Sequence, residues 1–134
     1  MRVQFRTEGG IAAGLRRMLD IDTDEKTITI GIADRVIGTD DLPVEEANEL
    51  ERLMEVAAFF ELPATSAPPA GAADHLRYTI SVTTWDPSHK RRSHKVQLTD
   101  PIENRRVREL LGYLNRLWEK RVDARLASRR RDTS

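Results

Sequence analysis

Apolar and polar residues alternate along two stretches of the chain, at residues 3–6 and 76–83. Strict alternation is typical of a strand with one buried face, because successive side chains point to opposite sides. Turn-forming residues follow at 86–89, and an alternating stretch returns at 94–98. The pattern therefore predicts one strand near the start of the chain and a β-hairpin in its second half.

A β-branched run at residues 27–32 predicts a further strand with three isoleucines on one face. The polar residues 22–26 before it are typical of a turn. Residues 34–41 after it are interpreted as a connection that turns tightly at Gly38. Residues 11–19 are left open, since an irregular segment, a short helix and a strand leading into Asp20–Asp22 all fit them.

Two helices are predicted from apolar residues spaced three and four apart. The first begins at Leu42–Glu46, where a proline and two carboxylates suit the first turn of a helix. It ends before Pro63, because the residue preceding a proline disfavours the helical conformation. The second follows Thr99–Pro101 and continues to about Leu126. Its apolar stripe consists of Val107, Leu110, Leu111, Leu114, Leu117 and Trp118.

This order of elements predicts an α+β fold rather than a parallel doubly wound sheet. We expect a small, mostly antiparallel sheet of about four strands, with two main helices packed on one face. Residues 63–73 are rich in Pro, Ala, Ser, Thr and Gly and are expected to form an exposed connection. Residues 1–126 are expected to be a single domain, and residues 127–134 a flexible basic tail.

The formal net charge of zero conceals an asymmetry between the two halves of the chain. Residues 1–74 contain 7 Lys and Arg against 15 Asp and Glu, whereas residues 75–134 contain 15 against 7. The simpler interpretation is that the two halves pack against each other and attract. The alternative is a dipolar surface that steers a charged partner.

Composition excludes several classes of protein. The chain has no cysteine, which excludes disulfides, thiolate nucleophiles and cysteine-ligated metal sites. No run of about 18 apolar residues is present, so no membrane-spanning helix is expected. The alternating residues 1–6 do not form the apolar region of a secretory signal, so we expect a cytoplasmic protein.

Candidate metal and catalytic motifs are incomplete. Asp20–Asp24 begins like a calcium loop, but Glu25 and Gly31 occupy the positions where that loop needs glycine and glutamate. The histidines are His75, His89 and His94, and the last two flank a cationic run that disfavours a metal ion. The chain contains no HExxH, GxSxG, phosphate-loop or dinucleotide motif. We therefore expect no cofactor, no metal and no enzymatic activity.

Nucleic acid is the less favoured partner. Lys90–Arg92 with Trp85 nearby, together with the arginine-rich last helix, offers possible contacts to phosphates. The acidic first half would repel the same backbone. Nucleic acid is therefore disfavoured as a partner, and the oligomeric state is left open.

Several segments, in their order along the chain, resemble one family. They are Gly9-Gly10 followed by Ile11–Gly14, Leu42-Pro43 followed by the helix 46–53, the ending Ala57–Pro63, Ala73-Asp74 leading into Tyr78–Val82, and Arg92–Val96 before a leucine-rich helix. Over about residues 2–120 the chain resembles the emfourin family, small bacterial protein inhibitors associated with protealysin and often encoded beside genes for thermolysin-like proteases. Relative to the family pattern, the chain looks longer between Leu15 and Ile37 and at its last helix.

The resemblance implies noncovalent inhibition of a thermolysin-like zinc metalloprotease at its active site. Such enzymes prefer a bulky apolar residue just after the scissile bond, so an apolar side chain on a glycine-flanked segment suits their pocket. Leu15 is the expected anchor, with Arg16 and Arg17 reaching carboxylates on the rim of the enzyme. The alternative places Ile11, Leu15 and Met18 in the core. The expected protease-contacting residues are Gly9, Gly10, Ile11, Gly14, Leu15, Arg16 and Arg17. The competing function is a non-catalytic interaction module without inhibitory activity, with a protein or nucleic-acid partner.

Overall fold

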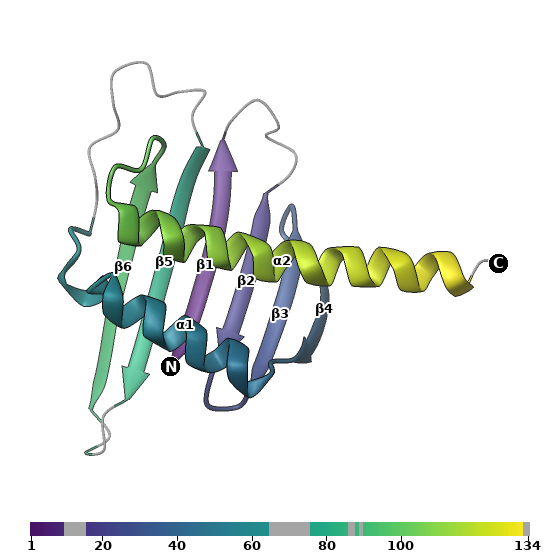
Figure 1. Cartoon of the computed structure of the whole chain (residues 1–134), viewed down its shortest axis with the longest axis horizontal. Coiled ribbons are helices and arrows are strands. Elements are labelled where there is room, and N and C mark those ends of the chain that lie inside the picture. The colour runs from purple at the N-terminus through teal and green to yellow at the C-terminus, as the bar shows by residue number, and fades with distance from the viewer. Residues whose placement is uncertain (10–15, 65–75, 86–87, 89, 133–134) are drawn as a thin grey trace.

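The computed structural model describes residues 1–9, 16–64, 76–85, 88 and 90–132 (Figure 1). In chain order the elements are the strands β1 (Arg2–Gly9), β2 (Arg17–Asp22), β3 (Thr27–Ile32) and β4 (Arg35–Asp41), the helix α1 (Val44–Val56), the short 3-10 helix η1 (Phe59–Glu61), the strands β5 (Leu76–Trp85) and β6 (Arg91–Thr99), and the helix α2 (Arg105–Asp132).

The strands form one antiparallel sheet in the order β4-β3-β2-β1-β5-β6. Both helices lie across the same face of this sheet (Figure 1), which confirms the expected α+β fold. The sheet has six strands rather than about four. The two additional strands are β2, which resolves part of the segment left open by the sequence, and β4.

The expected connection at residues 34–41, with a turn at Gly38, is wrong. The chain turns earlier, at Ala33 and Asp34, whose φ angles are 50° and 65°. Two successive residues with positive φ make the tight turn that suits a two-residue hairpin. Gly38 lies within β4, opposite Ile30, and a register shift between Ile30 and Gly31 marks a β-bulge.

The core lies between the sheet and the two helices. The strands supply every second residue, and the helices supply their apolar stripes, as the spacing of these residues predicts. Among the fully buried side chains are Val3, Phe5, Leu19, Ile21, Ile28, Ile30, Leu50, Ile80, Val82, Leu110 and Leu114. Trp118 is also buried, and its indole Nε1 donates a hydrogen bond to the Gly31 carbonyl at 3.0 Å.

Local signals set the ends of the helices. Pro43 precedes the first residue of α1, and Ala58 adopts the left-handed conformation (φ 49°) between α1 and η1. The Asn104 carboxamide oxygen accepts hydrogen bonds from the Arg106 and Val107 amides at 3.0 and 3.2 Å, which caps α2. This helix continues to Asp132, six residues past the expected end at Leu126.

Ion pairs join the acidic and basic halves of the chain. Glu46 of α1 binds Arg121 at 2.8 Å and Lys120 at 3.0 Å, both from α2. Arg125 of α2 binds Asp40 of β4 at 2.6 Å. These contacts support the interpretation that the halves of opposite charge pack on each other.

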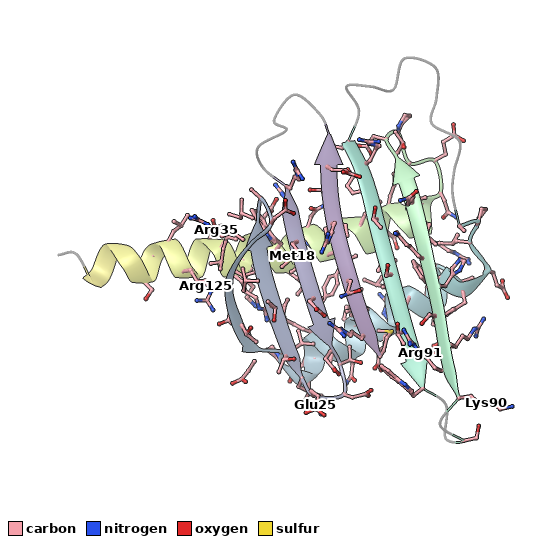
Figure 2. All side chains as sticks on the ribbon, turned by 180° about the vertical axis from the view of Figure 1, so that it is seen from behind. Met18, Glu25, Arg35, Lys90, Arg91 and Arg125 are labelled. Atoms are coloured by element: carbon pink, nitrogen blue, oxygen red, sulfur yellow. The ribbon has the colours of Figure 1, made fainter. Side chains whose placement is uncertain are left out.

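The second face of the sheet carries no described helix (Figure 2). Figure 2 shows Met18, Arg35 and Arg91 from this side, which we call the open face. Its side chains are mostly polar, because the positions that alternate with the buried core residues hold Arg, Lys, Thr, Ser, Gln, Asp and Glu. No described helix combines the length and apolar character that crossing a membrane requires.

Candidate functional site

The described residues on either side of the expected protease-contacting segment lie at one end of the sheet. Gly9 ends β1 with a φ of 83° and pairs with Leu76, the first residue of β5. On the other side of the segment, Arg16 precedes β2, which begins at Arg17. Gly10, Ile11, Gly14 and Leu15 lie outside the described residues. Segments 10–15 and 65–75 thus connect to neighbouring positions, since Gly9 and Leu76 are partners in the sheet.

Hydrogen bonds to two neighbouring segments hold the backbone of Arg16 and Arg17 in place. The Arg17 amide donates a hydrogen bond to the Thr7 hydroxyl at 3.1 Å, and the Arg16 carbonyl accepts one from the Ala33 amide at 2.9 Å. Thr7 is itself buried. Residues 16 and 17 are therefore held between β1 and the β3–β4 turn.

The side chain of Arg17 points toward the helices and binds residues of α2. Its guanidinium donates hydrogen bonds to the Asn115 carboxamide oxygen at 3.0 Å and to the Glu119 carboxylate at 2.9 Å. The same group lies 4.6 Å from the centre of the Trp118 ring, a cation–π distance. Arg17 therefore ties the start of β2 to α2, and its guanidinium is occupied within the molecule.

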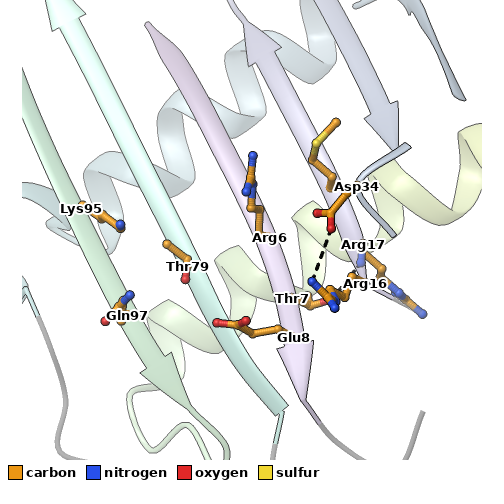
Figure 3. A pocket seen from close by; sticks show the side chains of 10 residues that line it. Arg6, Thr7, Glu8, Arg16, Arg17, Asp34, Thr79, Lys95 and Gln97 are labelled. Atoms are coloured by element: carbon orange, nitrogen blue, oxygen red, sulfur yellow. Dashed lines mark hydrogen bonds and ion pairs between the residues drawn. The ribbon is translucent and has the colours of Figure 1, made fainter. Parts of the chain in front are cut away.

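Arg16 turns the other way. Its side chain is 53% exposed and makes one long ion pair with Asp34 at 3.4 Å (Figure 3). An exposed pair of this kind contributes little to stability, so its partner is readily exchanged. Arg16 is thus free to bind a carboxylate of another molecule.

A hollow of about 230 Å³ lies on the open face beside these residues (Figure 3). It spans β2, β1, β5 and β6. Each of these strands supplies residues that are paired with, or next to, lining residues of the adjacent strand. The lining residues are Arg6, Thr7, Glu8, Arg16, Arg17, Met18, Asp34, Thr79, Lys95 and Gln97.

The hollow has an excess of positive charge. Arg6 and Lys95 flank Thr79 in Figure 3, and neither makes an ion pair with any residue that the structure describes. Thr79 and Gln97 face each other on β5 and β6 and supply polar groups between the two cations. A carboxylate is the ligand that this arrangement suits best.

Met18 belongs to the open face rather than to the core. It pairs with Arg6 and Gly31 on the neighbouring strands, one position out of phase with the buried Leu19. The alternative that placed Ile11, Leu15 and Met18 in the core is therefore wrong for Met18, and the other two residues lie outside the described part of the chain.

A second hollow, of about 530 Å³, lies on the helix side between α1 and α2. It is lined by Glu49, Arg52, Leu53, Arg105, Arg108, Glu109, Gly112 and Arg116. Two of its arginines are paired within the molecule, Arg52 with Glu49 at 2.6 Å and Arg105 with Glu109 at 3.5 Å. This hollow lies on the helix side, and Arg16 does not line it.

The one described histidine has a structural role. The ring of His94 lies 2.7 Å, through Nε2, from the Leu62 carbonyl and packs edge-on against Phe59 with 5.6 Å between ring centres. His75 and His89 lie outside the described residues. Within the described ranges, no three acidic or histidine side chains are grouped so that they could hold a metal ion.

The residues of the hollow were not identified from the sequence. Arg6, Thr79, Lys95 and Gln97 each occupy a polar position of an alternating strand, and such positions are usually only solvated. Their proximity depends on the order of β1, β5 and β6 in the sheet, which the alternation does not specify.

Comparison with known proteins places this chain in a family. Residues 28–115 match the family model described as Emfourin. The match spans well over half of the chain, so the protein belongs to the emfourin family, which is of the protease-inhibitor type. Neither the curated proteins nor the solved structures contain a match. The matched residues begin within β3 and end within α2, so β1, β2 and the last part of α2 lie outside them.

Proposed function

We propose that this protein is a noncovalent inhibitor of thermolysin-like zinc metalloproteases, and that segment 9–17 enters the active site of the enzyme. The observation that carries the proposal is the emfourin match over residues 28–115. The geometry around Gly9 and Arg17 supports the choice of segment, because both of its ends are fixed to central strands of the sheet.

Fixed ends reduce the free energy lost on binding. A segment held by β1 and β2 has fewer conformations to lose than a free peptide of the same length. The contacts of Arg17 with Asn115 and Glu119 extend this support to α2. We therefore assign Arg17 a positioning role, in place of the rim contact expected from the sequence.

Leu15 is the proposed anchor. Thermolysin-like enzymes hold a bulky apolar side chain in a pocket beside the zinc ion, and one buried anchor can contribute most of the affinity of an interface. Occupation of that pocket by Leu15 would exclude substrate without presenting a well-aligned peptide bond. Gly9, Gly10 and Gly14 would permit the bends that this presentation requires.

The hollow on the open face is the second part of the proposed interface. Arg6 and Lys95 line the same hollow as Arg16, and Arg16 is held only by an exposed pair. An enzyme seated on this segment would bring acidic groups of its rim against these cations. Charge complementarity at a rim increases the association rate more than the final affinity, and its effect decreases with salt.

The proposal is tested by titrating the protein into a peptidase assay with thermolysin and with any thermolysin-like enzyme encoded nearby. We expect loss of activity at micromolar inhibitor or below. Leu15→Glu should weaken inhibition by at least about thirtyfold, since removing a central anchor costs about 2 kcal/mol or more. The matched control is Trp85→Glu, which places the same charge at an exposed position at the opposite end of β5 from Leu76, the partner of Gly9, and should inhibit like the wild type.

Full activity of every enzyme tested would contradict the inhibitor class. Inhibition that Leu15→Glu leaves unchanged would keep the class and move the contact elsewhere. Segment 63–73 is then the next candidate, because its following strand begins at Leu76, beside Gly9.

One observation favours the alternative, an interaction module without inhibitory activity. Trp85 is 52% exposed and pairs with Arg91 across β5 and β6, so an aromatic and a cationic side chain lie together. Arg92 is occupied by the Phe60 ring, 4.1 Å away. A nucleic-acid partner would require binding to a single-stranded oligonucleotide that falls steeply as salt rises and is weakened by Trp85→Ala.

A further inference from the structure

The two edges of the sheet differ in how they are covered. The outer edge of β6 is bound by residues 62–64, since the Gln97 amide donates to the Ala64 carbonyl at 3.0 Å and His94 contacts the Leu62 carbonyl. Within the described ranges, no backbone segment pairs with the outer edge of β4. Unpaired amides and carbonyls along an edge are a template for another strand.

Exposed aliphatic side chains lie on both sides of the sheet near this free edge. Of the five large hydrophobic residues that are exposed in the described chain, three belong to it: Val36 (62%), Val44 (50%) and Leu126 (49%). Val36 is in β4 and faces the open side, because it pairs with Gly31. Val44 begins the helix that follows β4, and Leu126 follows the residue of α2 that binds Asp40 of β4. Exposed apolar groups beside an unpaired strand edge are typical of an interaction surface.

The end of α2 projects beyond the sheet on the side of β4 (Figure 1). Among the residues of this helix whose side chains the structure describes, Arg125 is the last to make an ion pair with the body of the protein, to Asp40 of β4. Residues 126–132 extend about 10 Å further at 1.5 Å per residue, which is roughly two strand spacings. This part of α2 also lies outside the residues that match the emfourin family.

Charge along β4 is complementary to itself in the antiparallel direction. The strand begins with Arg35 and ends with Asp40 and Asp41, and both Arg35 and Asp41 are exposed. A second β4 placed antiparallel beside the first sets the positive end of each strand against the negative end of the other. The projecting end of α2 would then lie over β4 of the other copy.

We propose that this face binds a second copy of the chain. The outer edge of β4 pairs with β4 of the other copy around a two-fold axis, so that two six-stranded sheets become continuous. The end of each α2 lies on the helix side of the partner's β4, where Leu126 becomes buried, and Val36 contacts the other copy on the open face. The same surface serves both copies, as a two-fold interface requires. This inference does not depend on the proposed inhibitory function.

The test is the mass of the purified full-length protein, measured by sedimentation or light scattering from micromolar to millimolar concentration. We expect the mass to rise to twice the 15.3 kDa of the chain. Val36→Lys and Leu126→Glu should each shift the monomer–dimer midpoint to at least tenfold higher concentration. Both side chains are exposed in the single chain, so the unfolding midpoint should stay near that of the wild type.

Trp85→Glu is the matched control, since it removes an exposed apolar side chain of similar exposure beside the opposite edge. It should leave the dimer intact. A wild-type protein that remains a monomer at all concentrations would overturn the proposal, as would a dimer that both edge variants leave unchanged. A monomer whose inhibition of a protease is lost in Val36→Lys would also overturn it, and would assign the edge to the enzyme.

Discussion

Three glycines of the described chain differ in what surrounds the position of an absent Cβ atom. At Gly31, a Cβ would lie 2.7 Å from the Met18 methyl group and 2.8 Å from the Arg35 carbonyl oxygen. At Gly38, the guanidinium of Arg125 occupies the space on its way to Asp40. At Gly112, in the middle of α2, no atom lies within 4 Å. Close packing against the backbone thus requires glycine at position 31, whereas a Cβ at position 38 would displace a side chain and one at position 112 would meet nothing.

The difference predicts opposite effects of the same substitution. Gly112→Ala should raise the free energy of unfolding by about 1 kcal/mol, because alanine favours the helix and nothing obstructs its methyl group. Gly31→Ala should lower it by about 2 kcal/mol, because a backbone carbonyl must move. Urea unfolding of both variants checks the pair, and a loss of stability in Gly112→Ala would contradict the open surroundings of that residue.

At the scale of elements, the start of β2 is attached to α2 through Arg17. Arg17→Ala removes hydrogen bonds to a carboxylate and an amide as well as the contact with Trp118, and should lower the free energy of unfolding by about 2 kcal/mol. Arg16→Ala is the control, since its pair with Asp34 is exposed and should contribute well under 1 kcal/mol. Equal effects in urea unfolding would show that Arg17 does not hold the strand to the helix.

The same variant tests the positioning role. If Arg17 supports the end of segment 9–17, Arg17→Ala should weaken inhibition even in conditions where the protein is fully folded. Arg17→Lys should restore little of it, because an ammonium cannot reproduce the two directed bonds and the stacking of a guanidinium.

The elements with strong periodicity were predictable, and those with mixed signals were not. The alternation at 76–83 predicted β5, and the isoleucines of 27–32 predicted β3. Pro43 and the apolar residues spaced three and four apart predicted α1. In β4, the sequence Gly38-Thr39-Asp40-Asp41 has turn-forming composition, and its strand conformation depends on pairing with β3 and on the ion pair of Asp40 with Arg125. A non-local partner overrides local propensity here.

The candidate site shows the same limit. The sequence placed both arginines at residues 16 and 17 in one role, because their side chains are chemically alike. Strand alternation sends Arg17 to the helix side and Arg16 to the open face, and that separation required knowing where β2 begins. The cations of Arg6 and Lys95 come together only through the strand order β1-β5-β6.

At the scale of the whole molecule, the attraction between the acidic and basic halves is concentrated at Glu46. Its carboxylate is only 14% exposed and binds Arg121, which is itself 9% exposed. Burial alone would raise the pKa of Glu46, but the hydrogen bonds and charges of Lys120 and Arg121 outweigh it and hold that pKa below its ordinary value of 4.5. The charged form of this side chain therefore stabilises the fold.

Because the pKa of Glu46 is lowered, the contribution of Glu46 to stability should depend on pH. A carboxyl group with a lowered pKa in the folded state contributes stability above its unfolded pKa and loses that contribution as pH falls through the folded value. Glu46→Gln should cost about 3 kcal/mol at neutral pH, as removal of one member of a buried pair does. The difference from the wild type should shrink below pH 4.5. Glu45→Gln, an exposed neighbour, is the control, and a gap that stays constant with pH would contradict the assignment.

The surroundings of Trp118 give the protein an optical reporter. The chain has two tryptophans, one 52% exposed at position 85 and one 7% exposed at position 118. Trp85→Phe leaves a single emitter that is bonded to β3 through Gly31 and stacked under Arg17 at the start of β2. Because Trp118 is buried, its emission maximum is expected at shorter wavelength than that of an exposed tryptophan, and a dissolved quencher should reach it poorly. Any partner that pulls on the end of segment 9–17 would move the guanidinium across the indole, so its binding can be followed without a label.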